Sequence, residues 1–221
     1  MTTGPSPRQL HVATSTDDWQ SLSDELLQGL IHALNNRVAA LSAFVELARL
    51  GDEEDDPLIV LPAEIAQLHQ VNGLFALLPA RRSDPEALEL PAVMEDALRL
   101  HEHHPRLRGE RCVVIYDGTP TPVRVPRWAL VRALVMLVHI AKRAGDSVQD
   151  RGGVPITVRS DDATVSVHVG TTSEPSADLV ALAERCGGSI VRSDGELELQ
   201  LPSIIEVRRR EREARGDATL K

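Results

Sequence analysis

The clearest pattern in the chain is an apolar stripe over residues 27–48, in which aliphatic residues recur at alternating spacings of four and three. The stripe comprises Leu27, Ile31, Leu34, Val38, Leu41, Val45 and Ala48. This spacing is that of a coiled-coil seam over about three heptads, so it predicts a long helix with one buried edge. Ser21 or Ser23 provides the start of this helix, and Gly51 and Pro57 end it within an acidic run.

A second stripe with the same spacing follows the acidic run. It comprises Leu61, Ile65, Leu68, Val71, Phe75 and Leu78. Pro62 falls in the first turn, where its missing N–H is harmless. Two long helices joined by a short loop predict an antiparallel hairpin over residues 18–80. Because one hairpin has too little surface to bury both stripes, we expect two copies to pair into a four-helix bundle, and hence a homodimer.

Beyond residues 81–90, which have the composition of a linker, helical and strand patterns alternate. Helices are predicted at 91–104, 126–143 and 176–186, and strands at 112–117, 155–161, 163–169, 189–193 and 196–202. This alternation predicts a two-layer α/β sandwich over residues 91–202, so the fold class is α+β. Residues 1–17 are expected to be a flexible tail, and residues 203–221 a charged tail that is a solvated helix or disordered.

Composition and charge exclude several functions. The 221 residues carry a formal net charge of −9, which argues against nucleic-acid binding because phosphate neutralisation needs clustered Lys and Arg. No apolar run approaches the roughly 20 residues of a membrane span, and the first residues lack a signal-peptide pattern. We therefore expect a cytoplasmic protein without a membrane partner. Cys112 and Cys186 lack metal-site spacing and are expected to be reduced core thiols.

His32 is the first candidate for chemistry. It follows the seam residue Ile31 by one position, which places it beside the buried stripe and partly exposed. A neutral imidazole is a good nucleophile towards an acyl phosphate, although a lone helical histidine is more often a solvated polar residue. Asn36, one turn later on the same face, could orient a phosphoryl group or position a water molecule. Asn35 is less well directed, and Arg37 could screen phosphate charge.

Three further histidines, His101, His103 and His104, form the tightest histidine cluster in the sequence. His101 and His104 are spaced i, i+3 and could hold a metal ion, but no further ligand set accompanies them. A helix end also suits histidine electrostatically, so we expect no metal site there. His139, in a strongly apolar helix, is expected to be a core or interface histidine.

The order of these elements resembles that of bacterial sensor histidine kinases over residues 20–202. The run His32-Ala33-Leu34-Asn35-Asn36 resembles their phosphoacceptor box. Residues 133–145 resemble the helix that supplies an Asn-rich nucleotide and magnesium site. Residues 182–202, with Gly187-Gly188, resemble the end of their ATPase domain.

Departures from the kinase pattern decide the predicted function. His139 and Ile140 stand where kinases place Asn, and the strand 165–169 runs into residues 170–175 without the adenine-reading Asp or room for a Gly-rich lid. Magnesium needs oxygen ligands and a phosphate cradle needs flexible Gly, so this domain is predicted not to bind ATP. Ala33 also replaces the acid that usually follows the phosphoacceptor.

The combination resembles a dimeric bacterial histidine phosphotransferase with a degenerate ATPase-like domain. That resemblance implies a phosphorelay protein that accepts and donates a phosphoryl group at His32, to and from aspartates of response-regulator receiver domains. No cofactor is expected in this chain, and magnesium would come with the receiver. A hybrid histidine kinase is a further possible partner.

Three alternatives stay open. The chain could be a non-catalytic kinase-like dimer that binds a receiver or a kinase. It could be a histidine kinase with a divergent nucleotide site. It could also dephosphorylate receivers, with Asn36 as the central residue.

Overall fold

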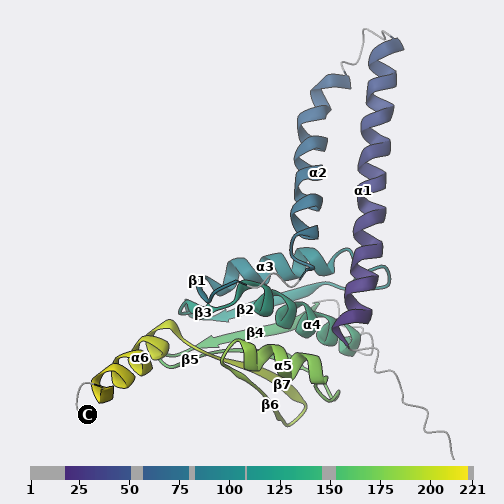
Figure 1. Ribbon diagram of the computed structural model, residues 1–221. Helices are drawn as coiled ribbons and strands as arrows, with labels where there is room; N and C mark the ends of the chain where they lie inside the picture. The colour runs from purple at the N-terminus through teal and green to yellow at the C-terminus, as the bar shows by residue number, and fades with distance from the viewer. Residues whose placement is uncertain (1–17, 51–56, 80–82, 108, 146–152, 219–221) are drawn as a thin grey trace, which may run out of the picture.

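A long helical hairpin rises from a two-layer α/β domain (Figure 1). The computed structural model describes residues 18–50, 57–79, 83–107, 109–145 and 153–218. The hairpin consists of α1 (Trp19–Leu50), the short 3-10 helix η1 (Pro57–Val60) and α2 (Leu61–Phe75). Both predicted helices are confirmed, although α2 ends three residues before Leu78. No helix in the described part of the chain combines the length and apolar character needed to span a bilayer.

The two-layer domain packs helices against a five-stranded mixed sheet. The helices are α3 (Leu90–His101), α4 (Arg127–Gly145) and α5 (Ala177–Arg185), with α4 between the other two. The strands, in sheet order, are β2 (Cys112–Asp117), β4 (Val154–Ser160), β5 (Thr164–Gly170), β7 (Glu196–Pro202) and β6 (Ser189–Ser193). Only β2 and β4 are parallel. This arrangement confirms the predicted α+β class and the two-layer sandwich.

The sheet buries one face, as the alternation of its strands predicts. Alternate residues of the three central strands are fully buried: Ile156, Val158, Val165, Val167, Val169, Leu197, Leu199 and Leu201. The residues between them include Thr157, His168 and Glu198, which are aligned across the opposite face of the sheet. The core is therefore aliphatic, as a chain with 2% aromatic residues requires.

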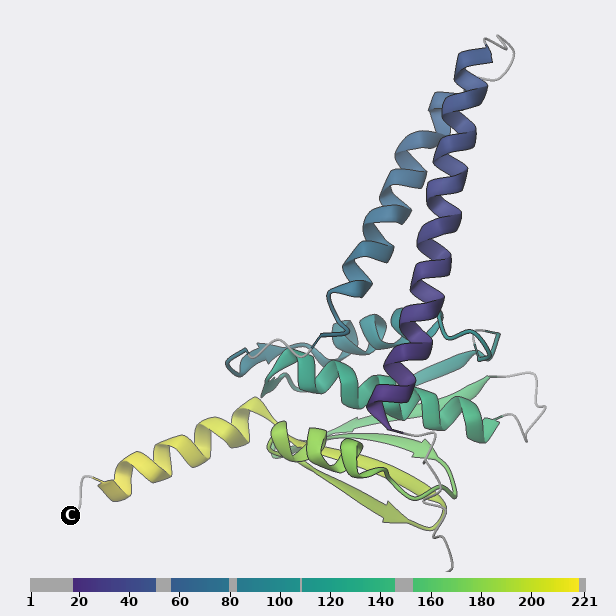
Figure 2. The same ribbon diagram turned by 45° about the vertical axis from the view of Figure 1, so that its right-hand side comes forward.

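Two short strands differ from the predicted pattern, whereas the charged tail takes one of its two expected forms, a helix. β1 (Glu86–Leu88) pairs antiparallel with β3 (Val123–Val125), so part of the segment 81–90 is a strand and not a linker. Strands of three residues are too short to show an alternation. The charged tail forms α6 (Ile204–Ala218), which projects from the domain in Figures 1 and 2.

The start of α1 lies earlier than predicted, because Asp18 caps the helix in place of Ser21 or Ser23. The backbone N–H of Ser21 donates to Asp18 Oδ1 at 2.6 Å, which is the bonding pattern of an N-cap. The backbone N–H of Trp19 donates to Asp178 Oδ2 at 2.9 Å. Because Asp178 belongs to α5, the first residue of the hairpin is tied to the sandwich.

The inner end of α1 packs on the sandwich, and this changes which side chains the helix buries. Leu22, Leu26 and Leu30 are at most 3% exposed and belong to the same core cluster as the residues of α3 and α4. The predicted seam lies on a different face of the helix. Its members Leu27, Ile31, Val38 and Val45 are 39–49% exposed. The seam is therefore not buried within one chain. The hairpin of a single chain does not form the core expected for a four-helix bundle.

Candidate functional site

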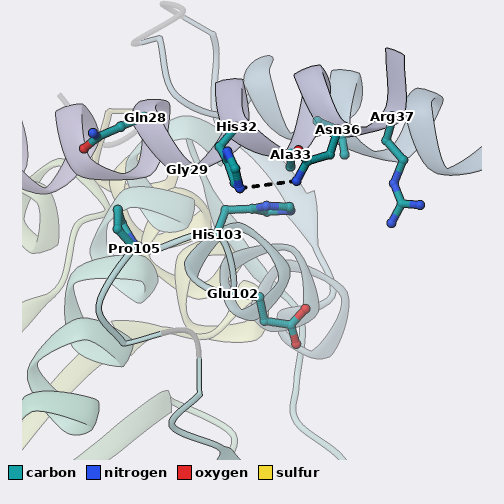
Figure 3. Close-up of a pocket in the computed structure, with 10 residues that line it drawn as sticks. Gln28, Gly29, His32, Ala33, Asn36, Arg37, Glu102, His103 and Pro105 are labelled. Atoms are coloured by element: carbon teal, nitrogen blue, oxygen red, sulfur yellow. Dashed lines mark hydrogen bonds between the residues drawn. The ribbon is translucent and has the colours of Figure 1, made fainter. Parts of the chain in front are cut away.

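His32 and Asn36 form a pair on the exposed surface of α1. They are one helical turn apart, and Asn36 Nδ2 lies 3.3 Å from His32 Nε2 (Figure 3). Because an amide nitrogen can only donate, this contact is a hydrogen bond when Nε2 carries the lone pair and the ring proton is on Nδ1. In that tautomer Nε2 is the nucleophilic atom, and it faces Asn36.

A close approach of two backbones places this pair over the sandwich. A Cβ atom at Gly29 would lie 1.6 Å from the carbonyl oxygen of His103. No side chain fits there, so α1 reaches the segment after α3 only because residue 29 is glycine. Gly29 precedes His32 by three residues and therefore lies on the same side of the helix.

The contact creates an open pocket of about 640 Å³ between α1 and the segment after α3. Its described lining comprises Gln28, Gly29, His32, Ala33, Asn36, Arg37, Val71, Glu102, His103 and Pro105. Figure 3 shows the His103 ring below the His32–Asn36 pair. Burial lowers the pKa of His103, and the Glu102 carboxylate opposes that effect only in part. Since the lowered pKa favours the uncharged form, His103 is a neutral imidazole in the free protein near neutral pH.

The other predicted site residues have different surroundings. Arg37 lines the pocket, but its guanidinium binds the Glu64 carboxylate of α2 at 3.1 Å. The ion pair joins the two arms of the hairpin and neutralises the charge that was expected to screen phosphate. Asn35 is exposed and is not among the described residues that line the pocket. Asn36 is thus the one of the two asparagines that lies beside His32.

The other two histidines near α3, His101 and His104, are buried in the core, whereas His103 lines the open pocket. α3 ends at His101, and His104 follows it in a turn, so that both rings face inwards and stack at a centroid distance of 5.2 Å. His139 of α4 completes the cluster, with its Nδ1 3.3 Å from His101 Nε2. His104 Nε2 also lies 2.7 Å from the Glu25 carboxylate of α1. The expectation that His139 is a core histidine is confirmed.

Burial keeps this inner cluster uncharged. It lowers the pKa of His101 to about 2, with further lowering by Lys142 and the two neighbouring histidines. Burial and the nearby His104 lower the pKa of His139 to about 4. In the described part of the chain, no three His, Cys, Asp or Glu residues are placed to hold a metal ion. The cluster is therefore a neutral polar contact between the base of α1 and the sandwich.

A second pocket, of about 400 Å³, lies where α4 meets the loop between β5 and α5. Its described lining comprises Ile140, Arg143, Ala144, Gly170, Thr171, Thr172, Ser173 and Gly195. Hydroxyl groups and backbone dominate this surface. The described lining contains no carboxylate or asparagine side chain, the groups that would hold magnesium or read an adenine ring.

The two cysteines lie in the sandwich. Cys186 is buried and Cys112 is half-buried, and both are free thiols. Burial raises the pKa of Cys186 to about 12 and that of Cys112 to about 11. Both are therefore protonated and unreactive near neutral pH, as their apolar sequence context predicts.

Sequence reasoning missed the contribution of Gly29 and His103 to the site. His103 drew notice only as part of a possible metal cluster, and Gly29 not at all. Their importance depends on α1 crossing the end of α3, a contact between segments more than 70 residues apart. No local pattern in the sequence signals that crossing.

Comparisons with known proteins return structures but no family. No protein-family model and no curated protein matches the sequence. Among solved structures, the chain is similar to the Acinetobacter baumannii histidine kinase AdeS, with 17% identity, 78% of this chain and 98% of that chain covered, and a TM-score of 0.42. It is also similar to a histidine kinase from Burkholderia phymatum, with 16% identity, 77% of this chain and 97% of that chain covered, and a TM-score of 0.40.

The chain is also similar to the ATP-binding domain of PrrB from Mycobacterium tuberculosis. The identity is 15%, 55% of this chain and 98% of that chain are covered, and the TM-score is 0.44. At these identities and TM-scores, a likeness does not establish a family, a ligand or an activity for this chain. Its chemistry has to be inferred from its own residues.

Proposed function

We propose that the chain is a histidine phosphotransferase of a bacterial phosphorelay, in which His32 accepts and donates a phosphoryl group. The observation that carries this proposal is the His32–Asn36 pair. The imidazole is exposed and lines an open pocket, and its Nε2 lies 3.3 Å from the Asn36 amide nitrogen, which can donate to it. A nucleophilic nitrogen in this position is within reach of another protein.

The transfer step uses the lone pair of His32 Nε2. This atom forms a bond to the phosphorus of a receiver aspartyl phosphate, and the P–O bond to the aspartate breaks. The bonding electron pair leaves with the aspartate as its carboxylate, while the proton on Nδ1 stays on the ring. The reverse step returns the phosphoryl group to a second receiver. Magnesium would be supplied by the receiver, since phosphoryl transfer depends on charge neutralisation and positioning.

Two features support a protein that does not take its phosphoryl group from ATP. The described lining of the second pocket contains no carboxylate or asparagine side chain to hold magnesium. Ala33, next to His32, cannot act as a base during an attack on ATP. In this proposal the sandwich is an ATPase-like domain that has lost its nucleotide, and the chain itself holds no cofactor.

We also propose that the protein works as a homodimer. Between residues 31 and 49 of α1, no described side chain is fully buried. The exposed apolar residues of this helix keep the spacing of a coiled-coil seam, and the hairpin supplies two helices of a four-helix bundle. The proposed partners of the dimer are receiver domains, with a hybrid histidine kinase as the source of phosphate.

Phosphoryl transfer from receivers tests the function. Receiver domains from the same genome would be loaded with labelled acetyl phosphate and mixed with the wild-type protein or with His32→Gln. We expect label on the wild type from at least one receiver and none on the variant. A wild type that stays unlabelled across the receivers would favour the non-catalytic dimer.

Nucleotide binding tests the kinase alternative. Titration calorimetry with ATP and magnesium should detect no binding in the micromolar range. A micromolar dissociation constant would contradict the proposed loss of the nucleotide site and would favour a divergent histidine kinase.

A further inference from the structure

The pocket beside His32 contains a second histidine that has no role in the transfer step proposed above. His103 lines the same pocket as His32, from the segment that follows α3. Figure 3 places its ring below the His32–Asn36 pair. The Gly29 contact holds the backbone of His103 against α1, so the position of this ring relative to His32 is set by the fold.

A phosphoryl group on His32 would bring two negative charges into this pocket. The described arginines that line the two pockets shared by His103 are Arg37, Arg99 and Arg127. Each of them is already paired with a carboxylate, of Glu64, Glu95 and Asp96 respectively. A pocket in which the cations are already paired has little positive charge left for an incoming dianion.

Apart from His32 itself, His103 is the histidine in the described lining of this pocket, and an imidazole can gain a proton near neutral pH. The charged or titratable groups that line its two pockets are His32 and Arg37 from α1, Glu102 beside it, Asp96 and Arg99 from α3, and Arg127 from α4. Burial lowers its pKa in the free protein. A dianion beside an imidazole favours the protonated form, so phosphorylation opposes the effect of burial.

We propose that His103 is a second histidine of the phosphoryl site. It is neutral in the free protein. When His32 carries a phosphoryl group, His103 becomes protonated and binds the phosphoryl oxygens. This inference rests on the proposed function of His32. It adds a residue that binds the transferred group, and it gives the sandwich a direct part in the site. The ring proton donated by His103 would form a charge-assisted hydrogen bond to the phosphoryl oxygen.

Chemical phosphorylation tests this role without a receiver. Phosphoramidate transfers its phosphoryl group when His32 Nε2 bonds to phosphorus, the P–N bond breaks and ammonia leaves. Mass spectrometry should locate the group on His32, and His32→Gln should remain unmodified there. Imidazole NMR titration of the wild type would then measure the proton affinity of His103 in the free and phosphorylated protein. We expect at least about tenfold tighter proton binding after phosphorylation.

A variant tests whether the charge matters. In His103→Gln the side chain can donate a hydrogen bond but cannot become charged, so phosphorylation by phosphoramidate should be about tenfold slower near neutral pH. The difference from wild type should shrink as the pH rises, because His103 then stays neutral. His69→Gln, an exposed histidine of α2, is the matched control and should behave as wild type.

The outcomes separate the two proposals. A wild type that phosphoramidate does not modify at His32 would overturn the proposed function together with this inference. A modified wild type whose His103 binds protons equally well in both states would overturn the role of His103 alone. Equal phosphorylation rates in His103→Gln and wild type would do the same. The NMR titration uses only the wild-type protein, so it decides the question even where the variant folds poorly.

Discussion

At the scale of residues, Asn36 would have different roles in the two reactions considered for this pocket, phosphotransfer and receiver dephosphorylation. Its amide is the described hydrogen-bond partner of His32 Nε2. In phosphotransfer the amide would orient the ring and then bind a phosphoryl oxygen. In dephosphorylation of a receiver it would instead hold an attacking water molecule, and transfer to His32 would not depend on it. The same contact therefore predicts different consequences of its removal.

We predict that Asn36→Ala slows phosphorylation of His32 by a receiver about fivefold without abolishing it. The change removes one hydrogen bond, whose net contribution is about 1 kcal/mol. The measurement is the rate of label transfer from a phosphorylated receiver. Asn35→Ala is the matched control, because Asn35 is exposed and outside the described lining, and it should transfer at the wild-type rate.

A different result would favour the dephosphorylation alternative. In that case Asn36→Ala would take up label on His32 as fast as wild type. It would, however, lose the release of inorganic phosphate from the receiver. The two products, phosphorylated His32 and free phosphate, can be quantified in the same reaction.

At the scale of elements, the two helical glycines of the hairpin have opposite surroundings. A Cβ at Gly29 would collide with the carbonyl oxygen of His103, whereas a Cβ at Gly73 in α2 would meet nothing within 4 Å. Alanine is ordinarily the better helix former by about 1 kcal/mol. Whether alanine raises or lowers the free energy of unfolding therefore depends on whether the glycine lies where α1 crosses the segment after α3.

We predict that Gly29→Ala lowers the free energy of unfolding by about 1–3 kcal/mol, because the backbones must separate. Gly73→Ala should raise it by up to about 1 kcal/mol. Denaturant titration of both variants measures the difference, and each kcal/mol corresponds to about 2–4 °C in Tm for a chain of this size. If Gly29→Ala proved as stable as Gly73→Ala, α1 would not cross His103 as the structure has it.

The helices and strands are largely predictable from the sequence, but which face of each helix is buried is not. The strands of the sandwich alternate because one side is buried, and the long helices carry uninterrupted aliphatic spacings. α1, however, carries two apolar faces, one through Leu22, Leu26 and Leu30 and one through Leu27 and Ile31. The sandwich covers the first face, and periodicity alone favoured the second. Which face is covered depends on tertiary contacts that no local pattern encodes.

In the candidate site, too, some features could be predicted from the sequence and others depend on tertiary contacts. His32 and Asn36 were identifiable because their i, i+4 spacing places them together on any helix. Arg37 was selected only because it is near His32 in the sequence, and its guanidinium forms an ion pair with Glu64 on the facing helix. His103 reaches the site through the packing of the hairpin on the sandwich. Contacts within one helix were thus predictable, and contacts between elements were not.

At the scale of the whole molecule, the hairpin has a well-packed base and an underpacked outer part. Its base shares the core of the sandwich through Leu22, Leu26 and Leu30. Arg132 of α4 adds to this junction, since its guanidinium lies over the rings of Trp19 and Trp128 and donates to the carbonyl of Leu78. In the outer part, the described side chains of α1 from residue 31 onwards are at most partly buried.

In the proposed homodimer, a second copy of the chain would cover the exposed apolar residues of this hairpin. Val38 is 49% exposed and lies in the middle of the seam. In a dimer that buries the seam, Val38→Glu would place a carboxylate from each chain in an apolar interface, where an unpaired charge is strongly unfavourable. We predict that this substitution weakens the dimer at least about 100-fold, which corresponds to about 2.7 kcal/mol.

Sedimentation velocity at several protein concentrations measures this change, with the wild type sedimenting as a dimer at micromolar concentration. Val191→Glu is the matched control, because Val191 is a similarly exposed valine on β6, away from the hairpin. It should leave the dimer intact, while circular dichroism should show that both variants keep their helices. A monomeric wild type, or a dimer unaffected by Val38→Glu, would mean that the seam serves another contact. Since the base of α1 is buried by the chain's own sandwich, the loss of the dimer should leave the fold of each chain in place.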